Sequence, residues 1–315
     1  MKILVTGGCG YVGSVLIPRL LKKNYKIINI DTQWFGNYLK NHRNLKNIKM
    51  NISEIEKLKE KNIKAVIHLA SIANDPMAEL DKNLSWETSA LNTLKLMEFI
   101  KKNKIKKILY ASSGSVYGIK KDKRVTEEKP LKPISLYNKV KMITERVILS
   151  YKKYCDVFII RPATVCGYSP RMRLDVTVNV LTYNALKNNL IKVFGGKQIR
   201  PNIHIEDMCR VYEFFLKKGQ NFSGIYNAGF ENKSIIDIAN QVSKKTGSKI
   251  RVFKDKNDPR SYRLDSSKLI NAGFKPKKNF IDAIIEIINM HENKKLKIDK
   301  KNFSVKWLSH LIKKI

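Results

Sequence analysis

The chain has 315 residues, enough to bury a full core, and suits one large domain or two smaller ones. Hydrophobic residues make up 43% of it in runs no longer than a strand, which excludes a disordered chain and a membrane-spanning helix. Lysine and arginine outnumber aspartate and glutamate by 62 to 27, a net charge of +35. These cations are spread along the chain without interleaved aromatic residues, so we expect a lysine-rich surface and no nucleic-acid partner.

The first two-thirds of the chain alternates short β-branched runs with longer amphipathic stretches. Strands are predicted at 2–6, 26–31, 48–52, 65–70, 107–112 and 157–161, and helices at 11–23, 83–102 and 135–153. Strands that alternate with helices indicate an α/β fold with a Rossmann-like, doubly wound parallel sheet and right-handed crossovers.

The alternation of strands and helices becomes less regular after residue 161, where loops with proline and glycine separate shorter elements. We therefore expect a dinucleotide-binding domain at 1–165, a smaller substrate-binding lobe at 166–292 interleaved with it, and a basic C-terminal tail at 293–315. The tail carries apolar residues that include Phe303, Trp307 and Leu308. We interpret it as a helix docked on the protein's own surface, with contact to a membrane surface or a partner as the alternative.

The first fourteen residues, MKILVTGGCGYVGS, place Gly7, Gly10 and Gly13 between a predicted strand and the start of a helix. A dinucleotide pyrophosphate rests on backbone N–H groups at such a turn. A side chain on Gly7 would obstruct the turn, one on Gly10 would hold the phosphates away, and Gly13 lets helix and strand pack closely. Asp31 ends the second strand, where a carboxylate binds the adenosine ribose and repels a 2′-phosphate. The pattern predicts NAD rather than NADP.

A second group of polar residues predicts redox chemistry. Ser113 follows the fifth predicted strand, at the sheet edge where α/β folds bind ligands. Tyr137 and Lys141 are four residues apart on a predicted helix, so their side chains share one face. With its pKa lowered by Lys141 and a bound nicotinamide, Tyr137 would take the proton of a substrate hydroxyl held by Ser113. The expected reaction class is alcohol–ketone redox.

From Met1 to about His291 the chain resembles the extended short-chain dehydrogenases/reductases, and within them the NAD-dependent nucleotide-sugar epimerases and dehydratases. The resemblance rests on TGGCGYVG, Asp31, VIHLAS, SSGSVYG, the Tyr137/Lys141 pair, RPATVCG, RPNIHIED and YNAG. It implies catalytic roles for Ser113, Tyr137 and Lys141, and pairing into a homodimer through the two long helices of the first lobe. The cofactor residues that it implies are Gly7, Gly10, Tyr11, Val12, Gly13, Asp31, Ile52, Leu69, Ala70, Tyr137 and Lys141. The substrate residues are Thr164, Asn179, Arg200 and Arg260, with Asn179 and Arg200 on the diphosphate.

Departures from the family pattern narrow the reaction. Gly114 and Ser115 stand where 4,6-dehydratases carry the Asp-Glu pair that expels water, which disfavours dehydration. Thr164 stands where an asparagine is frequent. The stretch SPRMRLDVTVN is similar to a subgroup that includes GDP-heptose 4-dehydrogenases of surface-polysaccharide pathways. The resemblance thus implies an NAD-dependent nucleotide-sugar epimerase/dehydrogenase that oxidises a sugar hydroxyl, at C4, in surface-polysaccharide sugar biosynthesis.

Alternatives stay open at this point. The protein would otherwise be a non-catalytic NAD-sensing Rossmann protein, or a reductase of the same family with a non-sugar substrate. Arg171 and Arg173 are each interpreted as solvated surface arginines, with binding of a substrate diphosphate as the alternative. His204 is interpreted as a packed histidine and Asp207 as the cap of the following helix. The four cysteines and five histidines do not group at ligand spacing, so no metal is expected. Met1-Lys2 runs directly into a strand without a leader, and we expect a cytoplasmic protein.

Overall fold

The computed structural model describes residues 1–253 and 261–313, and its centre is a seven-stranded sheet. The strand order is β10-β6-β5-β4-β1-β2-β3, and every pair is parallel. The strands are β1 (Lys2–Thr6), β2 (Lys26–Asp31), β3 (Leu45–Lys49), β4 (Ile63–His68), β5 (Lys107–Ala111), β6 (Asp156–Pro162) and β10 (Gly224–Ala228). This order confirms the predicted doubly wound α/β fold.

Two strands differ from the sequence-based expectation. β3 lies three residues before the predicted range, because Asn51 already begins the next turn by accepting a hydrogen bond from the Ser53 backbone at 3.0 Å. β10 was not predicted as a strand. Its five residues pair with β6 at the sheet edge, far along the chain from the strands that they join.

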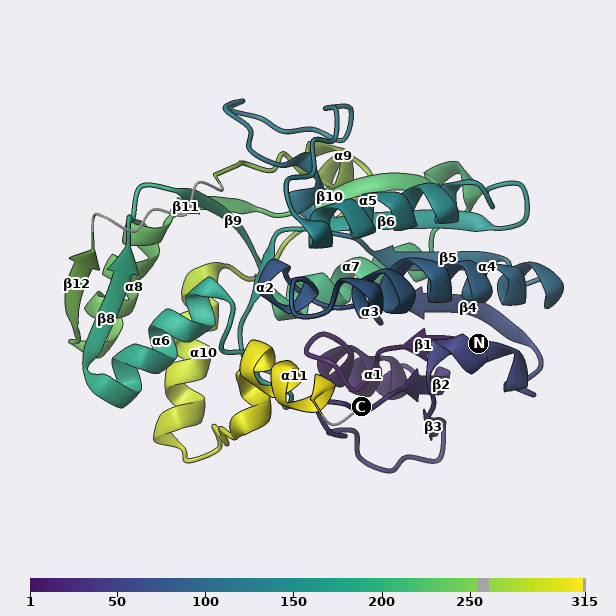
Figure 1. Ribbon diagram of the computed structural model, residues 1–315, viewed down its shortest axis with the longest axis horizontal. Coiled ribbons are helices and arrows are strands. Elements are labelled where there is room, and N and C mark those ends of the chain that lie inside the picture. Colours follow the sequence, from purple (N-terminus) through teal and green to yellow (C-terminus); the bar gives the residue numbers. More distant parts are fainter. Residues whose placement is uncertain (254–260, 314–315) are drawn as a thin grey trace.

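Helices cover both faces of the large sheet (Figure 1). One face carries α1 (Gly13–Lys22) and α7 (Ile205–Leu216), and the other carries α4 (Asn92–Lys102) and α5 (Leu136–Leu149). Side chains of β1 alternate between them: Ile3 and Val5 join the core under α1 and α7, and Leu4 joins the core under α4 and α5. A parallel sheet that is buried on both faces has strands that read as continuous apolar runs.

The helix predicted at 83–102 is interrupted. It consists of α3 (Lys82–Trp86), a π-helical turn η2 (Glu87–Leu91) and α4. The Ser89 carbonyl accepts hydrogen bonds from the hydroxyls of Thr93, at 2.5 Å, and of Thr144 on α5, at 3.2 Å. Such turns re-aim a helix and are frequent at functional sites.

The second lobe combines two small sheets with three helices. Its strands are β7 (Thr164–Cys166), β8 (Leu190–Phe194), β9 (Ile199–His204), β11 (Glu231–Ser234) and β12 (Lys249–Phe253), in the orders β11-β9-β7 and β12-β8. Helices α6 (Thr177–Asn188), α8 (Ile235–Thr246) and α10 (Phe280–Glu292) enclose its core. The remaining short helices are α2 (Asp75–Ala78), α9 (Ser267–Asn271), η1 (Ile52–Lys57), η3 (Gly114–Tyr117), η4 (Gln220–Phe222) and η5 (Lys300–Asn302).

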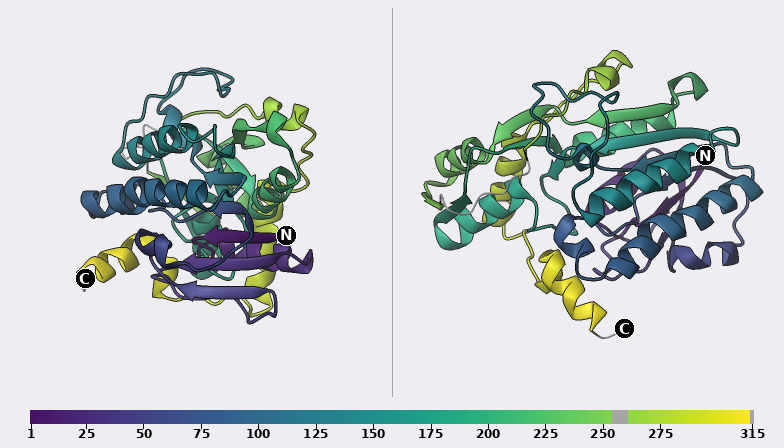
Figure 2. Two further views of the ribbon diagram at one scale, coloured as in Figure 1. Left: turned by 90° about the vertical axis from the view of Figure 1, so that its right-hand side faces the viewer. Right: turned by 45° about the horizontal axis from the view of Figure 1, so that its top comes forward.

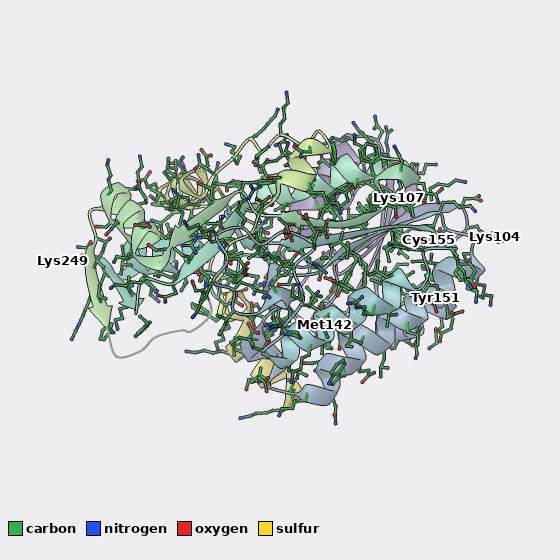
Figure 3. The ribbon with its side chains drawn as sticks, turned by 90° about the horizontal axis from the view of Figure 1, so that it is seen from above. Lys104, Lys107, Met142, Tyr151, Cys155 and Lys249 are labelled. Atoms are coloured by element: carbon green, nitrogen blue, oxygen red, sulfur yellow. The ribbon has the colours of Figure 1, made fainter. Side chains whose placement is uncertain are left out.

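The second lobe lies beyond the carboxyl ends of the parallel strands. In Figure 3, Lys104, Lys107 and Cys155 mark the amino ends of β5 and β6, while Lys249 marks the opposite end of the molecule. Ligands bind at the carboxyl ends of open α/β sheets, so the two lobes meet where a site is expected.

The C-terminal tail forms η5 and the docked helix α11 (Ser304–Ile312). Leu308 is 1% exposed and packs with Ile72, Met77 and Ala78. The Trp307 indole donates a hydrogen bond to the Trp34 carbonyl at 2.6 Å. Figure 2 shows α11 at the edge of the molecule beside α2. The docked-helix interpretation is confirmed, and no helix in the described residues is long and apolar enough to span a membrane.

Gly8, which the sequence analysis did not single out, is the tightest position of the N-terminal turn. A Cβ on Gly8 would lie 2.1 Å from Asn29 Oδ1, the atom that accepts the Gly8 backbone hydrogen bond at 2.9 Å. Gly8→Ala is therefore expected to lower the free energy of unfolding by about 1–3 kcal/mol, as overpacking does. Urea denaturation measures it.

Gly219→Ala is the matched control. Gly219 has φ −84°, and its added Cβ would meet only Asn221 Oδ1, at 3.4 Å. Its stability should change by less than about 0.5 kcal/mol. Equal stability of the two variants would contradict the tight approach at Gly8.

Candidate active site

A pocket of about 410 Å³ lies at the carboxyl ends of the large sheet and reaches the second lobe. Known ligand sites occupy about 300–1,000 Å³. The pocket brings together all of the predicted cofactor and catalytic residues, and from the second lobe Thr164 and Arg200. Arg260 lies outside the described residues.

The glycine turn has the shape that a dinucleotide requires. Gly7 has φ +76°, and a Cβ there would lie 2.6 Å from the Ala70 backbone. A Cβ on Gly10 would meet only the Gly7 carbonyl, at 3.1 Å, so it would occupy the space beside the turn that a phosphate needs. α1 begins at Val12 and Gly13 without a side-chain cap, which leaves its positive end for an anion.

Gly13 serves a different contact from the one expected. A Cβ on Gly13 would lie 2.5 Å from the Gly8 Cα, so the close approach is within the turn itself. The expected close packing of helix against strand at this residue is therefore wrong. The absence of a side chain at both Gly8 and Gly13 lets the turn fold back on itself.

Asp31 ends β2 and organises the same turn. Its Oδ2 accepts a hydrogen bond from the Cys9 backbone at 2.9 Å, and its Oδ1 accepts one from the Gln33 backbone at 2.6 Å. Burial raises the pKa of Asp31, and these hydrogen bonds and Arg171 oppose that effect. The carboxylate lines the pocket and keeps free lone pairs for ribose hydroxyls. Glycine cradle and carboxylate together fit a dinucleotide.

Ser113 stands where β5 ends, as the N-cap of η3. Its Oγ accepts a hydrogen bond from the Ser115 backbone at 3.2 Å and lies 2.7 Å from Ser115 Oγ. Ser115 in turn donates to Asn138 Oδ1 at 2.5 Å. The Ser113 side chain also lowers the pKa of Tyr137, so the residue at the end of β5 acts on the tyrosine at the start of α5.

Lys141 is 3% exposed and lines the pocket. Its ammonium donates to the Ala111 carbonyl at 2.7 Å and lies 5.9 Å from the centroid of the Tyr137 ring. Burial lowers the pKa of Lys141 to about 7, against the opposing effect of Glu145.

The pKa of Tyr137 moves opposite to expectation. Burial raises it to about 12, while the hydrogen bond with Ser113 and the charge of Arg173 pull it down. Lys141 is not among the groups that act on this pKa in the protein alone, and the expected lowering by Lys141 together with a bound nicotinamide stays a prediction. The buried ammonium of Lys141 holds its proton weakly and is directed at the Ala111 carbonyl.

A buried ion pair anchors α5 below these residues, and sequence reasoning missed it. Arg161 on β6 donates to both carboxylate oxygens of Glu145, at 3.0 and 2.7 Å. The two side chains are 3% and 2% exposed, and the Ser112 hydroxyl also donates to Glu145. Glu145 follows Lys141 by four residues, the one signal that could have placed it on the same helix face.

The segment SPRMRLD is not solvated. Arg171 is 4% exposed and lines the pocket. Arg173 is mostly buried and donates to both carboxylate oxygens of Asp175, at 2.9 and 2.7 Å, and Asn74 donates to the same carboxylate. The interpretation of both arginines as surface residues is wrong, because this segment packs between α2, α11 and the turn at Tyr11.

Two further assignments need correction. Asn179 is fully buried, where it accepts from the Gly167 backbone at 2.9 Å and donates to the Tyr11 hydroxyl at 3.0 Å. It does not line the pocket in the described residues and its amide is used within the protein, so the structure gives the expected substrate contact no support.

The cap of α7 is the other correction. His204 provides it, accepting from the Glu206 backbone at 3.1 Å, and its burial confirms the packed histidine. Asp207 instead accepts from the Lys277 and Lys278 backbones, so its expected capping role is wrong. Among the described residues no three His, Cys, Asp or Glu side chains are grouped to hold a metal ion.

The parallel sheet, the glycine turn and the Ser113, Tyr137 and Lys141 group in one pocket define a dinucleotide-dependent enzyme of the short-chain dehydrogenase type. Residues 3–229 match the model of the NAD dependent epimerase/dehydratase family, and the chain belongs to this family. Membership confirms the resemblance, an enzyme and NAD as its cofactor.

Similar proteins cover nearly the whole chain. A putative UDP-glucose 4-epimerase of Methanocaldococcus jannaschii is 29% identical over 307 residues, 92% of this chain and 98% of that protein. The solved dTDP-glucose 4,6-dehydratase of Bacillus anthracis, in complex with NAD, is 27% identical with a TM-score of 0.82, covering 94% of this chain and 98% of that one. The UDP-glucuronic acid 4-epimerase of Bacillus cereus, with UDP-glucuronic acid and NAD, is 26% identical with a TM-score of 0.80, covering 93% and 100%.

The buried Lys141 predicts a pH dependence of stability. Its pKa is about 7 in the folded chain and near 10.5 when exposed, so between these values the unfolded chain binds more protons. Stability should therefore rise with pH from about 7 to 8, by up to about 1.4 kcal/mol per pH unit, below the range in which the buried cysteines, whose pKa values burial raises from the ordinary 9.0, oppose the rise. Lys141→Met should remove that rise, measured by urea denaturation of the nucleotide-free protein.

Lys139→Met is the control, because Lys139 is exposed on the same helix. It should keep the wild-type slope. A wild-type slope that persists in Lys141→Met would refute the assignment of the titrating group.

Proposed function

We propose that the protein is a 4-epimerase of a nucleotide-diphosphate sugar, which oxidises the C4 hydroxyl. The observation that carries this proposal is the convergence of Ser113 and Tyr137 with the glycine turn and Arg200 in one pocket. Relatives named as 4-epimerases of UDP-sugars support it, among them those of M. jannaschii and Lactobacillus helveticus and a probable UDP-arabinose 4-epimerase of Arabidopsis thaliana.

The chain's own residues would divide the work of oxidation. Ser113 would hold the sugar hydroxyl through Oγ, and the Tyr137 phenolate would take its proton. Lys141, fixed on the Ala111 carbonyl, would hold the cofactor's ribose. NAD supplies the hydride acceptor. With a pKa of about 12, Tyr137 stays protonated at neutral pH in the protein alone, so ligands must favour its ionised form.

The second lobe would hold the substrate's diphosphate. Arg200 lies on β9 and Thr164 on the paired strand β7, and both line the pocket. Arginine's planar fork suits a diphosphate. Arg260 remains a prediction for the same role.

The surroundings of Ser113 favour epimerisation over dehydration. Gly114 carries no acidic group, and a Cβ there would lie 2.6 Å from Leu264 Cδ1, so Leu264 would have to move to admit a side chain. The Ser115 hydroxyl donates a hydrogen bond to Asn138 and cannot replace a carboxylic acid as proton donor. A dehydrogenase would use the same residues and differ in releasing the ketone.

We infer a homodimer through α4 and α5. Three apolar side chains on this side are exposed: Leu91, at the end of η2, Leu94 on α4 and Ile143 on α5. Pairing would bury them. The surface-polysaccharide role and the cytoplasmic location remain predictions.

A substrate panel tests the proposed reaction. The protein with NAD is incubated with UDP-, GDP-, dTDP- and CDP-sugars, and NMR follows the configuration at C4. We expect inversion at C4 without net reduced nicotinamide absorbance. Accumulating NADH would instead identify a dehydrogenase, and no turnover of any sugar would reject the substrate class.

Tyr137→Phe tests the proton acceptor. Removing the hydroxyl should lower kcat by at least about a hundredfold, because general-base catalysis contributes that much, and leave NAD affinity nearly unchanged. Tyr154→Phe, at an exposed tyrosine that does not line the pocket, should keep full activity. Full activity of Tyr137→Phe would remove the catalytic assignment.

A further inference from the structure

Arg171 is a buried cation that forms no direct ion pair with a carboxylate in the described residues, although the charge of Asp175 acts on it from farther away. Its Nη2 donates to Ser304 Oγ at 3.0 Å and its Nη1 lies 3.5 Å from the Met172 carbonyl, while Nε has no acceptor in the described chain. The guanidinium lies over the Phe35 ring, 4.3 Å from its centroid. Burial and Arg173 lower the pKa of Arg171 to about 10, so it remains charged at neutral pH. Such a buried charge needs a counter-ion.

The surroundings of Arg171 are those of the cofactor. It lines the pocket together with Phe35 and Tyr11, and it interacts electrostatically with both Asp31 and Tyr11. Asp31 marks the ribose position and Tyr11 belongs to the glycine turn, where a dinucleotide's diphosphate rests. Its neighbour Arg173 is already paired with Asp175, and its charge acts on both Tyr137 and Tyr11.

The C-terminal tail holds Arg171 in place. Ser304, the first residue of α11, accepts the Arg171 hydrogen bond. Asn302 contacts the same segment twice. Its side-chain amide donates to the Met172 carbonyl at 2.9 Å, and its backbone carbonyl accepts from the Leu174 backbone at 3.0 Å. The Trp307 indole holds the residue before Phe35 by donating a hydrogen bond to the Trp34 carbonyl. The tail thus contacts both segments that lie against the guanidinium.

We propose that Arg171 binds the diphosphate of the dinucleotide cofactor and that the tail segment 300–312 positions its guanidinium. The unpartnered Nε and a neighbouring Nη offer two parallel donors to one phosphate, a geometry that lysine cannot supply. A nucleotide sugar also carries a diphosphate, but the proposed contacts of that ligand, Arg200 and Thr164, lie on the second lobe.

Ligand binding to the full-length protein, freed of nucleotide, distinguishes the two diphosphates. Isothermal titration calorimetry would measure the affinity for NAD, ADP-ribose and UDP. Arg171→Gln should weaken NAD and ADP-ribose by at least about tenfold, the worth of a hydrogen bond to a charged group, and leave UDP within about twofold. Arg251→Gln, on the distant strand β12, removes the same charge and should change none of them.

Two further variants keep the test decisive. Arg171→Lys keeps the charge without the fork and should still lose NAD affinity. Ser304→Ala removes the support and should weaken NAD binding by about threefold. Unchanged NAD affinity in folded Arg171→Gln, or a loss of UDP affinity instead, would overturn the proposal. If Arg171→Gln does not fold, unchanged affinity in Ser304→Ala overturns it. No sugar turnover is measured, so the proposed epimerase reaction can fail independently.

Discussion

The site depends on the buried ion pair between Arg161 of β6 and Glu145 of α5. Tyr137, Lys141 and Glu145 follow one another at four-residue intervals, so fixing the last one on the sheet sets the depth and rotation of the first two. The pair is almost fully buried and makes two parallel hydrogen bonds, which is the geometry that repays desolvation of both charges. Losing one partner would leave the other charged and buried, and α5 without its anchor.

Burial at this anchor also sets the acid–base character of the site. It raises the pKa of Tyr137 and lowers that of Lys141, so the protein alone drives both groups toward their neutral forms. The groups that oppose this for Tyr137 are Ser113 and Arg173, which come from opposite sides of the pocket. With both groups in place the pKa of Tyr137 is still about 12, so the phenol would act as a base only when bound ligands add to their effect, which would couple proton transfer to ligand binding.

Patterns that are local in the sequence predicted the fold and the centre of the site. Glycine spacing, an acid at a strand end and a four-residue interval on a helix each depend on a few neighbouring residues. What the sequence could not supply depends on partners far along the chain. Arg171 reads as a solvated residue until Ser304, 133 positions later, covers it. Asn179 resembles a ligand contact until the Tyr11 hydroxyl, 168 positions earlier, is found against it.

The tail explains how irregular segments can form a defined cofactor site. The walls near Phe35, Asn74 and Arg171 come from three loops, and ordering a loop costs conformational entropy that its own few contacts do not offset. Side chains of the tail provide the missing contacts. Trp307 and Asn302 donate hydrogen bonds to the backbone carbonyls of Trp34 and Met172, and Leu308 packs among apolar residues beside α2. A ligand that orders the same loops from inside the pocket acts on the same equilibrium. A cofactor that orders these loops would therefore stabilise the docked tail, and the docked tail would strengthen cofactor binding by the same free energy.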